Sequence, residues 1–222
     1  MFTEVDSELL LDAYRQGIFP MADKATDGHF HFYRPELRGQ LSIDALHIPR
    51  RLRKTVRQAP YKVTVDRAFE DIIDGCAEEN TNRKVTWINK PIRDVFVELH
   101  QQGHAHSVEC WDGEELAGGL YGLAIGRVFC GESMVSFKQD ASKIALVHLC
   151  ARLHAGNFSV LDTQFTNPHL EQFGVYEIPQ EKYEKMIVKE MKKKADFVLP
   201  GRSETELVTA YLDYLSDSSW RA

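Results

Sequence analysis

Two acidic residues stand at the ends of apolar, strand-like segments, where a carboxylate could do chemistry. Glu132 lies between Gly131 and Ser133 after one apolar run, and Asp162 ends a second run. Burying a carboxylate is costly unless it is paired or hydrogen-bonded, so a carboxyl group in these surroundings is a candidate for a shifted pKa and a chemical role. On a strand, Gln164 would point to the same side as Asp162 and could orient it or a substrate.

Both carboxylates also have structural interpretations. Glu132 could form a buried ion pair with Lys143 or Arg127. Asp162 could cap a helix that begins near Asn167, and from the residues alone this capping role is the stronger interpretation of Asp162.

The elements that would position these residues follow from hydrophobic periodicity and turn signals. Helices are predicted over residues 8–16, 49–57, 68–76, 92–102, 140–155 and 204–215, with a further lysine-rich helix near residue 189. Strands are predicted over 61–66, 106–111, 116–124, 127–134 and 158–162, and residues 28–35 are predicted to form a loop. Ser7 and Asn89 are candidate N-caps, and Asp112-Gly113 is a hairpin signal. The pattern indicates an α+β fold with a mostly antiparallel sheet flanked by helices.

The composition is typical of a globular protein. Of 222 residues, 43% are hydrophobic and 27% are charged. The four cysteines are widely spaced and form no CxxC pair, which favours reduced thiols over disulfides or a zinc site. Because the sequence has no long apolar run and no secretory signal, we expect a cytoplasmic protein without a membrane span or a metal.

Two basic clusters interrupt a chain whose net charge is −6. One occupies the predicted helix at 49–57 and the other occupies the lysine-rich helix. Each cluster alone is typical of a solvated helix surface, but the pair favours a surface for nucleic-acid phosphates. The candidate phosphate-binding residues are Arg50, Arg51, Arg53, Arg57, Lys189, Lys192 and Lys193.

Several collinear blocks carry a resemblance to a known family. They cover residues 14–20, 86–89, 103–109, 118–122, 129–134, 141–143 and 161–164, with Asn167 and His169. In this order they resemble the leucyl/phenylalanyl-tRNA–protein transferase family over roughly residues 8–190. The order of elements is also similar to the acetyltransferase-like (GNAT) fold of that family's larger domain.

The resemblance implies both a domain organisation and an activity. A small N-terminal domain would span residues 1–60, a GNAT-like catalytic domain 61–199, and a C-terminal helical extension 200–222. The implied activity moves leucine or phenylalanine, with methionine as a further candidate, from aminoacyl-tRNA to an N-terminal Arg or Lys of a protein. The product would be an N-end-rule degradation signal. The expected partners are charged tRNA and acceptor proteins, and the expected state is a monomer.

The implied reaction is attack of an α-amine on an activated ester, which needs no cofactor. The enzyme has to position the reactants, assist proton removal and stabilise the oxyanion. The resemblance implies that Asp162 with Gln164 is catalytic, with Asp162 either as a general base or as an electrostatic anchor for the amine. It also implies that Glu132 contacts the acceptor's basic N-terminal residue or its amine.

The resemblance further implies where the donor would bind. An apolar pocket for its side chain would be formed by Leu120, Phe129, Leu146, Leu149, Leu153 and Leu161, although the 146/149/153 spacing is also that of an ordinary buried helix face. Trp87 is a candidate for stacking on the terminal ribose or base, and Asn167 for a substrate contact. Many family members carry a tryptophan pair in the N-terminal loop. Here the aromatic candidates for the terminal adenine are Phe32 and Tyr33.

Two other functions remain as alternatives. An acyl-CoA-dependent acyltransferase of the same fold would need a glycine-rich pyrophosphate loop before a helix, and residues 139–142 contain no glycine. A non-catalytic RNA-binding protein would leave Asp162 and Glu132 without a role.

Overall fold

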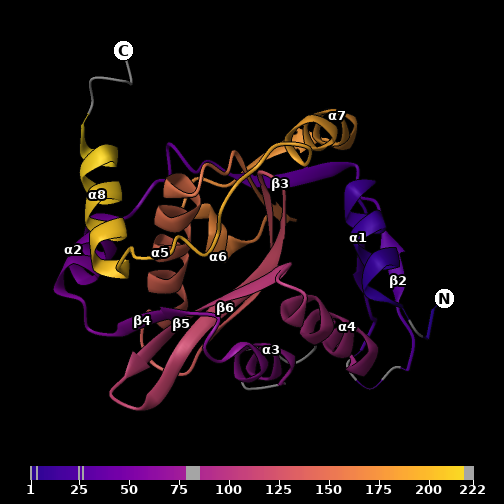
Figure 1. Cartoon of the computed structure of the whole chain (residues 1–222), viewed down its shortest axis with the longest axis horizontal. Helices are drawn as coiled ribbons and strands as arrows, with labels where there is room; N and C mark the ends of the chain where they lie inside the picture. Colours follow the sequence, from indigo (N-terminus) through magenta and orange to yellow (C-terminus); the bar gives the residue numbers. More distant parts are fainter. Residues whose placement is uncertain (1, 4, 25, 27, 79–85, 218–222) are drawn as a thin grey trace.

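The computed structural model of the chain describes residues 2–217 except 4, 25, 27 and 79–85. Within them, one sheet has the strand order β4-β5-β6-β7-β8-β3-β9, and a small second sheet pairs β1 with β2 (Figure 1). The strands are β1 Phe19–Met21, β2 His31–Tyr33, β3 Leu37–Leu41, β4 Lys62–Val65, β5 Ala105–Asp112, β6 Glu115–Ile125, β7 Val128–Ser136, β8 Val160–Gln164 and β9 Tyr176–Pro179.

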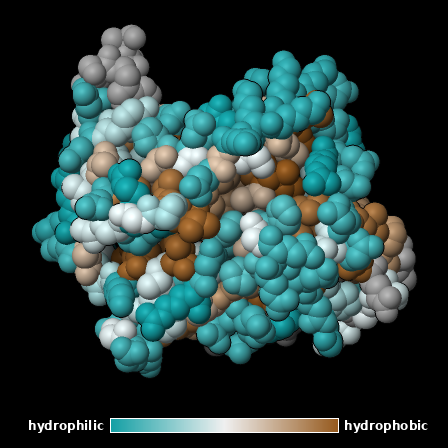
Figure 2. All heavy atoms as spheres, viewed as in Figure 1, coloured by the Kyte–Doolittle hydropathy of each residue, from teal (hydrophilic) through white to brown (hydrophobic). Residues whose placement is uncertain are grey.

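Helices cover both faces of the large sheet. They are α1 Ser7–Arg15, α2 Arg50–Gln58, α3 Phe69–Ala77, α4 Lys90–Gln101, α5 Ala141–Ala155, α6 Pro168–Glu171, α7 Gln180–Glu190 and α8 Glu204–Ser216. One apolar core lies among α2, α5, α8 and the sheet, and a second lies among α1, α3, α4, α7 and the sheet. In the face shown in Figure 2, hydrophilic residues dominate, and hydrophobic residues are visible over α5 and between α7 and α1. The prediction of an α+β fold with a mostly antiparallel sheet is therefore confirmed.

Local signals explain most of the element boundaries. The Asn89 side chain accepts a hydrogen bond from the Ile92 N–H and begins α4 as predicted. Gly113, with φ of 62°, makes the turn between β5 and β6. The predicted N-cap of α1 was wrong, because the Asp6 carboxylate accepts from the Leu9 N–H, whereas the Ser7 hydroxyl donates to Glu98.

The strand β3 joins the N-terminal part of the chain to the large sheet. It lies between β8 and β9 and pairs antiparallel with both. Residues 28–35 are not entirely loop either, since they contain β2, which pairs with β1. The division of the chain at residue 60 remains a prediction.

The connection from β7 through α5 to β8 creates an opening in the sheet. β7 and β8 are parallel, and their pairing ends at Cys130 and Asp162. Beyond this point β7 continues to Ser136, whereas β8 ends at Gln164 and stays paired with β3 on its other edge. The two strands therefore separate at the residues that the sequence singles out.

The described residues hold no helix that is long and apolar enough to cross a membrane. In the same part of the chain, no group of three or more His, Cys, Asp or Glu side chains is arranged to hold a metal ion.

Candidate functional site

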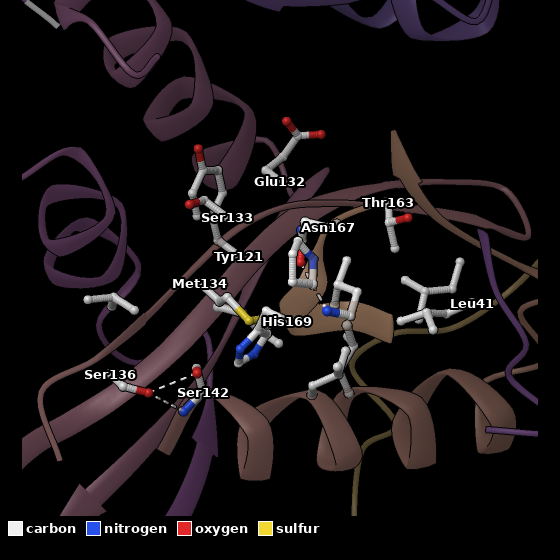
Figure 3. A pocket seen from close by; sticks show the side chains of 18 of the residues that line it. Leu41, Tyr121, Glu132, Ser133, Met134, Ser136, Ser142, Thr163, Asn167 and His169 are labelled. Carbon is white, nitrogen blue, oxygen red and sulfur yellow. Dashed lines mark hydrogen bonds between the residues drawn. The ribbon is translucent and has the colours of Figure 1, made fainter. Parts of the chain in front are cut away.

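A pocket of about 710 Å³ lies where β7 and β8 separate. Figure 3 shows Glu132 and Ser133 on one side of it, Leu41 and Thr163 on another, and Met134 and His169 near its centre. The structure brings together these sequence-predicted residues at its lining: Trp87, Leu120, Glu132, Leu146, Leu149, Leu161 and Asn167. The lining therefore combines an apolar wall with a carboxyl group, an arrangement typical of small-molecule binding sites.

Glu132 owes its position to a β-bulge. In the pairing of β6 with β7, Tyr121 lies opposite Ser133 and Gly122 lies opposite Gly131, so Glu132 is the extra residue. A bulge re-aims side chains and is frequent beside active sites. Every residue from 131 to 136 contributes to the lining of the pocket, and the bulge shifts the side-chain alternation of β7 by one residue within this stretch.

The Glu132 carboxyl group is half-buried and has an altered proton affinity. Burial raises its pKa to about 8 from an ordinary value of 4.5, and the negative charge of Asp162 adds to the increase. The nearby Tyr14 hydroxyl, the Gln164 amide and the positive charge of Arg38 act against this increase. Lys143 pairs with Asp140 and Arg127 with Glu190, so neither forms the ion pair with Glu132 that the sequence left open.

The raised pKa of Glu132 predicts a pH-dependent stability. Between about pH 4.5 and pH 8 the folded protein keeps this proton while the unfolded chain loses it, so the free energy of unfolding falls as pH rises. Glu132→Gln has no proton to lose. We expect this variant to exceed the wild type in free energy of unfolding by roughly 1–3 kcal/mol above pH 8, allowing for solvent screening.

Chemical denaturation at about pH 5.5 and pH 8.5 measures this difference. Glu114→Gln, which changes an exposed carboxylate in the β5–β6 turn, is the matched control. Equal pH dependence in the wild type and Glu132→Gln would contradict the prediction.

Asp162 lies beneath the pocket, fully buried, in an ion pair with Arg38 of β3, which is also fully buried. The Arg38 guanidinium donates through Nε to Oδ1 at 2.8 Å and through Nη2 to Oδ2 at 2.6 Å. The Tyr183 hydroxyl donates to Oδ2 at 2.9 Å, and the Gln40 amide donates to Oδ1 at 3.1 Å. Asp162 does not cap α6, because the Asn167 side chain caps that helix itself.

Asp162 also controls the backbone that follows it. Its Oδ1 accepts from the Gln164 N–H at 3.1 Å, and Gln164 adopts a left-handed conformation with φ of 55°. The Gln164 side chain then reaches Glu132 and donates through Nε2 to Oε1 at 3.0 Å. The predicted site residues Asp162, Gln164 and Glu132 are therefore connected, with only Glu132 at the pocket lining.

Two predicted pocket residues have other surroundings. Phe129 is fully buried, and its ring packs on Phe158 and Phe197. Leu153 is likewise fully buried in the core with α8. Leu41 of β3 and Met134 of β7 line the pocket instead, and no local signal in the sequence indicated either residue.

His169 of α6 also lines the pocket. It belongs to the blocks that resemble the family, but the sequence predicted no role for it. Burial, followed by the charge of Lys143, lowers its pKa, so the ring is neutral at pH 7. Its Nε2 is buried and meets no hydrogen-bond partner among the described residues.

The aromatic candidates for nucleotide binding are divided between two places. Trp87 lines the pocket. Tyr33 lies on β2, with its ring 6.4 Å from the Phe19 ring, and Phe32 packs beside Phe30. Both β2 residues are half-buried.

The basic clusters lie on separate parts of the molecule, with α2 at the left and α7 at the upper right of Figure 1. Arg50 and Arg51 are exposed on α2. Arg53 instead donates to the Ser216 hydroxyl, and Arg57 pairs with Asp213, both on α8. On the other cluster, Lys193 pairs with Glu190.

Comparison with known proteins identifies relatives along most of the chain. Residues 3–36 match the leucyl/phenylalanyl-tRNA protein transferase N-terminal domain, and residues 40–188 match the leucyl/phenylalanyl-tRNA protein transferase family. The leucyl/phenylalanyl-tRNA–protein transferase of Phenylobacterium zucineum is 49% identical over 198 residues, covering 89% of this chain and 90% of the relative.

Two further relatives carry the same name. That of Hyphomonas neptunium is 51% identical over 190 residues, covering 86% of this chain and 74% of its own length. That of Nitrobacter winogradskyi is 49% identical over 195 residues, covering 88% of this chain and 87% of its own length. With these matches over the same residues that build the pocket, the chain belongs to the leucyl/phenylalanyl-tRNA–protein transferase family.

Proposed function

We propose that the protein transfers leucine or phenylalanine from aminoacyl-tRNA to the N-terminal Arg or Lys of acceptor proteins. Its family membership supports this activity. The observation that carries it in the structure is the pocket of about 710 Å³, which places leucine side chains of α5 and β8 beside the bulged Glu132. The apolar wall suits the donor side chain, and the carboxyl group suits an amine or a basic side chain.

The hydrogen-bond network of Asp162, Gln164 and Glu132 suggests a different role for each residue in the transfer. Glu132 lines the pocket and would contact the reactants, while Gln164 donates a hydrogen bond to it from behind the lining. Asp162 has all its hydrogen-bonding donors within the protein and no exposed surface. Asp162 therefore acts through the orientation of Gln164, with its negative charge adding to the field at the acceptor amine.

The remaining features of the proposal follow from the same family. Transfer of a bulky apolar residue to a protein N-terminus creates an N-end-rule degradation signal. We also propose that the larger region has a GNAT-like fold, which the separation of the parallel strands β7 and β8 around a pocket supports. Methionine as a third donor, a monomeric state and a cytoplasmic location are further parts of the proposal.

A transfer assay with purified protein tests this function directly. The wild type, supplied with radiolabelled leucyl-tRNA and a peptide that begins with arginine, should yield a labelled peptide. The same peptide with an acetylated N-terminus is the control, since it has no free α-amine to attack the ester. Label transfer from acyl-CoA instead would favour the acyltransferase alternative, and tRNA binding without transfer would favour the RNA-binding alternative.

The exposed arginines of α2 provide a second prediction. If they contact tRNA phosphates, neutralising Arg50 and Arg51 to Gln should weaken tRNA binding. The slope of log Kd against log salt should fall by about 0.7–0.9 for each lost contact, because fewer counterions are released. Filter binding at several salt concentrations measures the slope.

Lys90→Gln, which removes an exposed cation on α4, is the matched control and should leave the slope unchanged. Arg53 and Arg57 are less suitable targets, because their substitution would also remove contacts with α8. An unchanged slope in the Arg50 and Arg51 double variant would show that these arginines do not contact tRNA and are ordinary solvated surface.

A further inference from the structure

Arg38 is a buried residue to which the sequence pattern assigns no role. It lies between the two segments matched to the family, residues 3–36 and 40–188. All three guanidinium nitrogens have partners, with Nε and Nη2 donating to Asp162 and Nη1 donating to the Gly17 carbonyl at 2.9 Å. Such a fork-to-carboxylate pair fixes the geometry as well as the charge of the carboxylate.

Aromatic rings hold the Arg38 guanidinium from both sides. Its central carbon lies 4.6 Å from the Phe19 ring centroid and 4.4 Å from the Tyr183 ring centroid. Phe19 belongs to β1 and Tyr183 to α7, so the side chain is enclosed by elements from both ends of the chain. An ion pair enclosed in this way has little freedom to rearrange, because moving either charge exposes a buried partner.

The constraint passes from this pair to the pocket. Gly39 lies opposite Gln164 and Gln40 opposite Asp162, so Thr163 is an extra residue in β8. Asp162 Oδ1 holds the N–H of Gln164 in a left-handed conformation that residues other than glycine seldom adopt. This conformation directs the Gln164 amide to Glu132. Without Arg38, Asp162 would be a buried carboxylate without its cationic partner, and the turn that it holds would lose its support.

We propose that Arg38 is a positioning residue for aminoacyl transfer, which fixes the Asp162 carboxylate so that the following turn presents Gln164 to Glu132. The role of Arg38 in aminoacyl transfer rests on the proposed function. Its role in orienting Asp162 and Gln164 concerns the free protein and is independent of any substrate.

Arg38→Lys is the principal test, because lysine keeps the charge but has no planar fork. At saturating peptide and leucyl-tRNA we expect kcat to fall by about 10²-fold or more, with KM for tRNA within about threefold, because the reacting groups are misplaced while the tRNA surface is intact. The matched control is Arg152→Lys on α5. Arg152 is also almost fully buried, with a carboxylate partner in Glu204 and a carbonyl partner in Phe197.

Proton NMR of the Gln164 side-chain amide reports directly on its hydrogen bond to Glu132. If Arg38 only stabilised the fold, its substitution would leave this signal unchanged in the folded protein. Several polar and titratable groups surround the Glu132 carboxyl group. They are Tyr14 of α1, Arg38 of β3, Asp162 and Gln164 of β8, and Cys130 of the same strand as Glu132. In the wild type the Gln164 amide signals should titrate near pH 8, the pKa of Glu132. In Arg38→Lys this titration should disappear, and in Arg152→Lys it should persist.

The outcomes separate the two proposals. A wild type without transfer activity would refute the proposed function, while the NMR titration would still test Arg38. If Arg38→Lys keeps the Gln164 titration and a kcat within about threefold of Arg152→Lys, Arg38 is only structural and the inference is wrong. If Arg38→Lys does not fold, the same readouts apply to Arg38→Gln, whose amide can still donate to Asp162 but lacks the charge and the planar fork.

Discussion

Asp162→Asn should lower the turnover of the folded enzyme by about 10²-fold, because Gln164 is misplaced, while changing tRNA affinity much less. Asparagine keeps the shape of the side chain but removes the charge, so the Arg38 guanidinium loses its counter-charge in a fully buried place. The neutral side chain also holds the Gln164 turn less firmly, because one of its two acceptor oxygens becomes an NH₂ group. Single-turnover transfer and separate tRNA binding measurements give the two quantities.

The same substitution should reduce stability by about 3–5 kcal/mol, since it leaves a buried charge unpaired. The kinetic comparison therefore needs a control of equal burial. Glu109→Gln serves this purpose, because Glu109 is fully buried and accepts from Thr64, Ser107 and the start of α3. Glu109→Gln should lose stability but keep its turnover per folded molecule. Near-normal turnover in folded Asp162→Asn would make Asp162 a structural residue only.

The second large effect concerns donor selection by the pocket. Leu146 and Leu149 on α5 and Leu161 on β8 form a wall that the helix and the sheet hold in place. A donor branched at Cβ would crowd this wall close to its ester, so we expect isoleucyl- and valyl-tRNA to be at least about 10-fold poorer donors than leucyl-tRNA. Competition between donors in one assay measures the ratio of kcat/KM values, and equal transfer from isoleucyl-tRNA would contradict the prediction.

Filling the same wall should block the reaction. Leu146→Trp places a large ring in the pocket, and we expect transfer of leucine to fall by about 10²-fold with normal circular dichroism. Val188→Trp, on the exposed surface of α7, adds the same ring elsewhere and should leave transfer unchanged. Unimpaired transfer by a folded Leu146→Trp would show that the donor side chain binds outside this pocket.

The sequence was sufficient for elements whose signals are local. Asn89 marked the start of α4, the Asp112-Gly113 turn marked the β5–β6 hairpin, and the apolar pattern marked α5. The family resemblance, confirmed by the comparisons, supplied the expected activity and the blocks that contain the site.

The sequence was insufficient where a residue depends on distant partners. The strand β3 contains Arg38 and Gln40, whose polarity is typical of exposed chain, and both donate in the fold to the remote Asp162. The bulge at Glu132 has no local signature either, although it determines which residues of β7 reach the pocket. The family resemblance placed Phe129 in the pocket, whereas the structure places Met134 there.

The place of β3 in the sheet has a consequence for how the protein is made. Arg38 leaves the ribosome 124 residues before Asp162, and β3 has no neighbouring strand until β8 and β9 have been synthesised. At about 5–20 residues per second, the arginine waits roughly 6–25 seconds in a solvated nascent chain. Because Leu41 and Leu161 line the pocket from β3 and β8, a nascent chain cannot form this pocket before β8 has been synthesised.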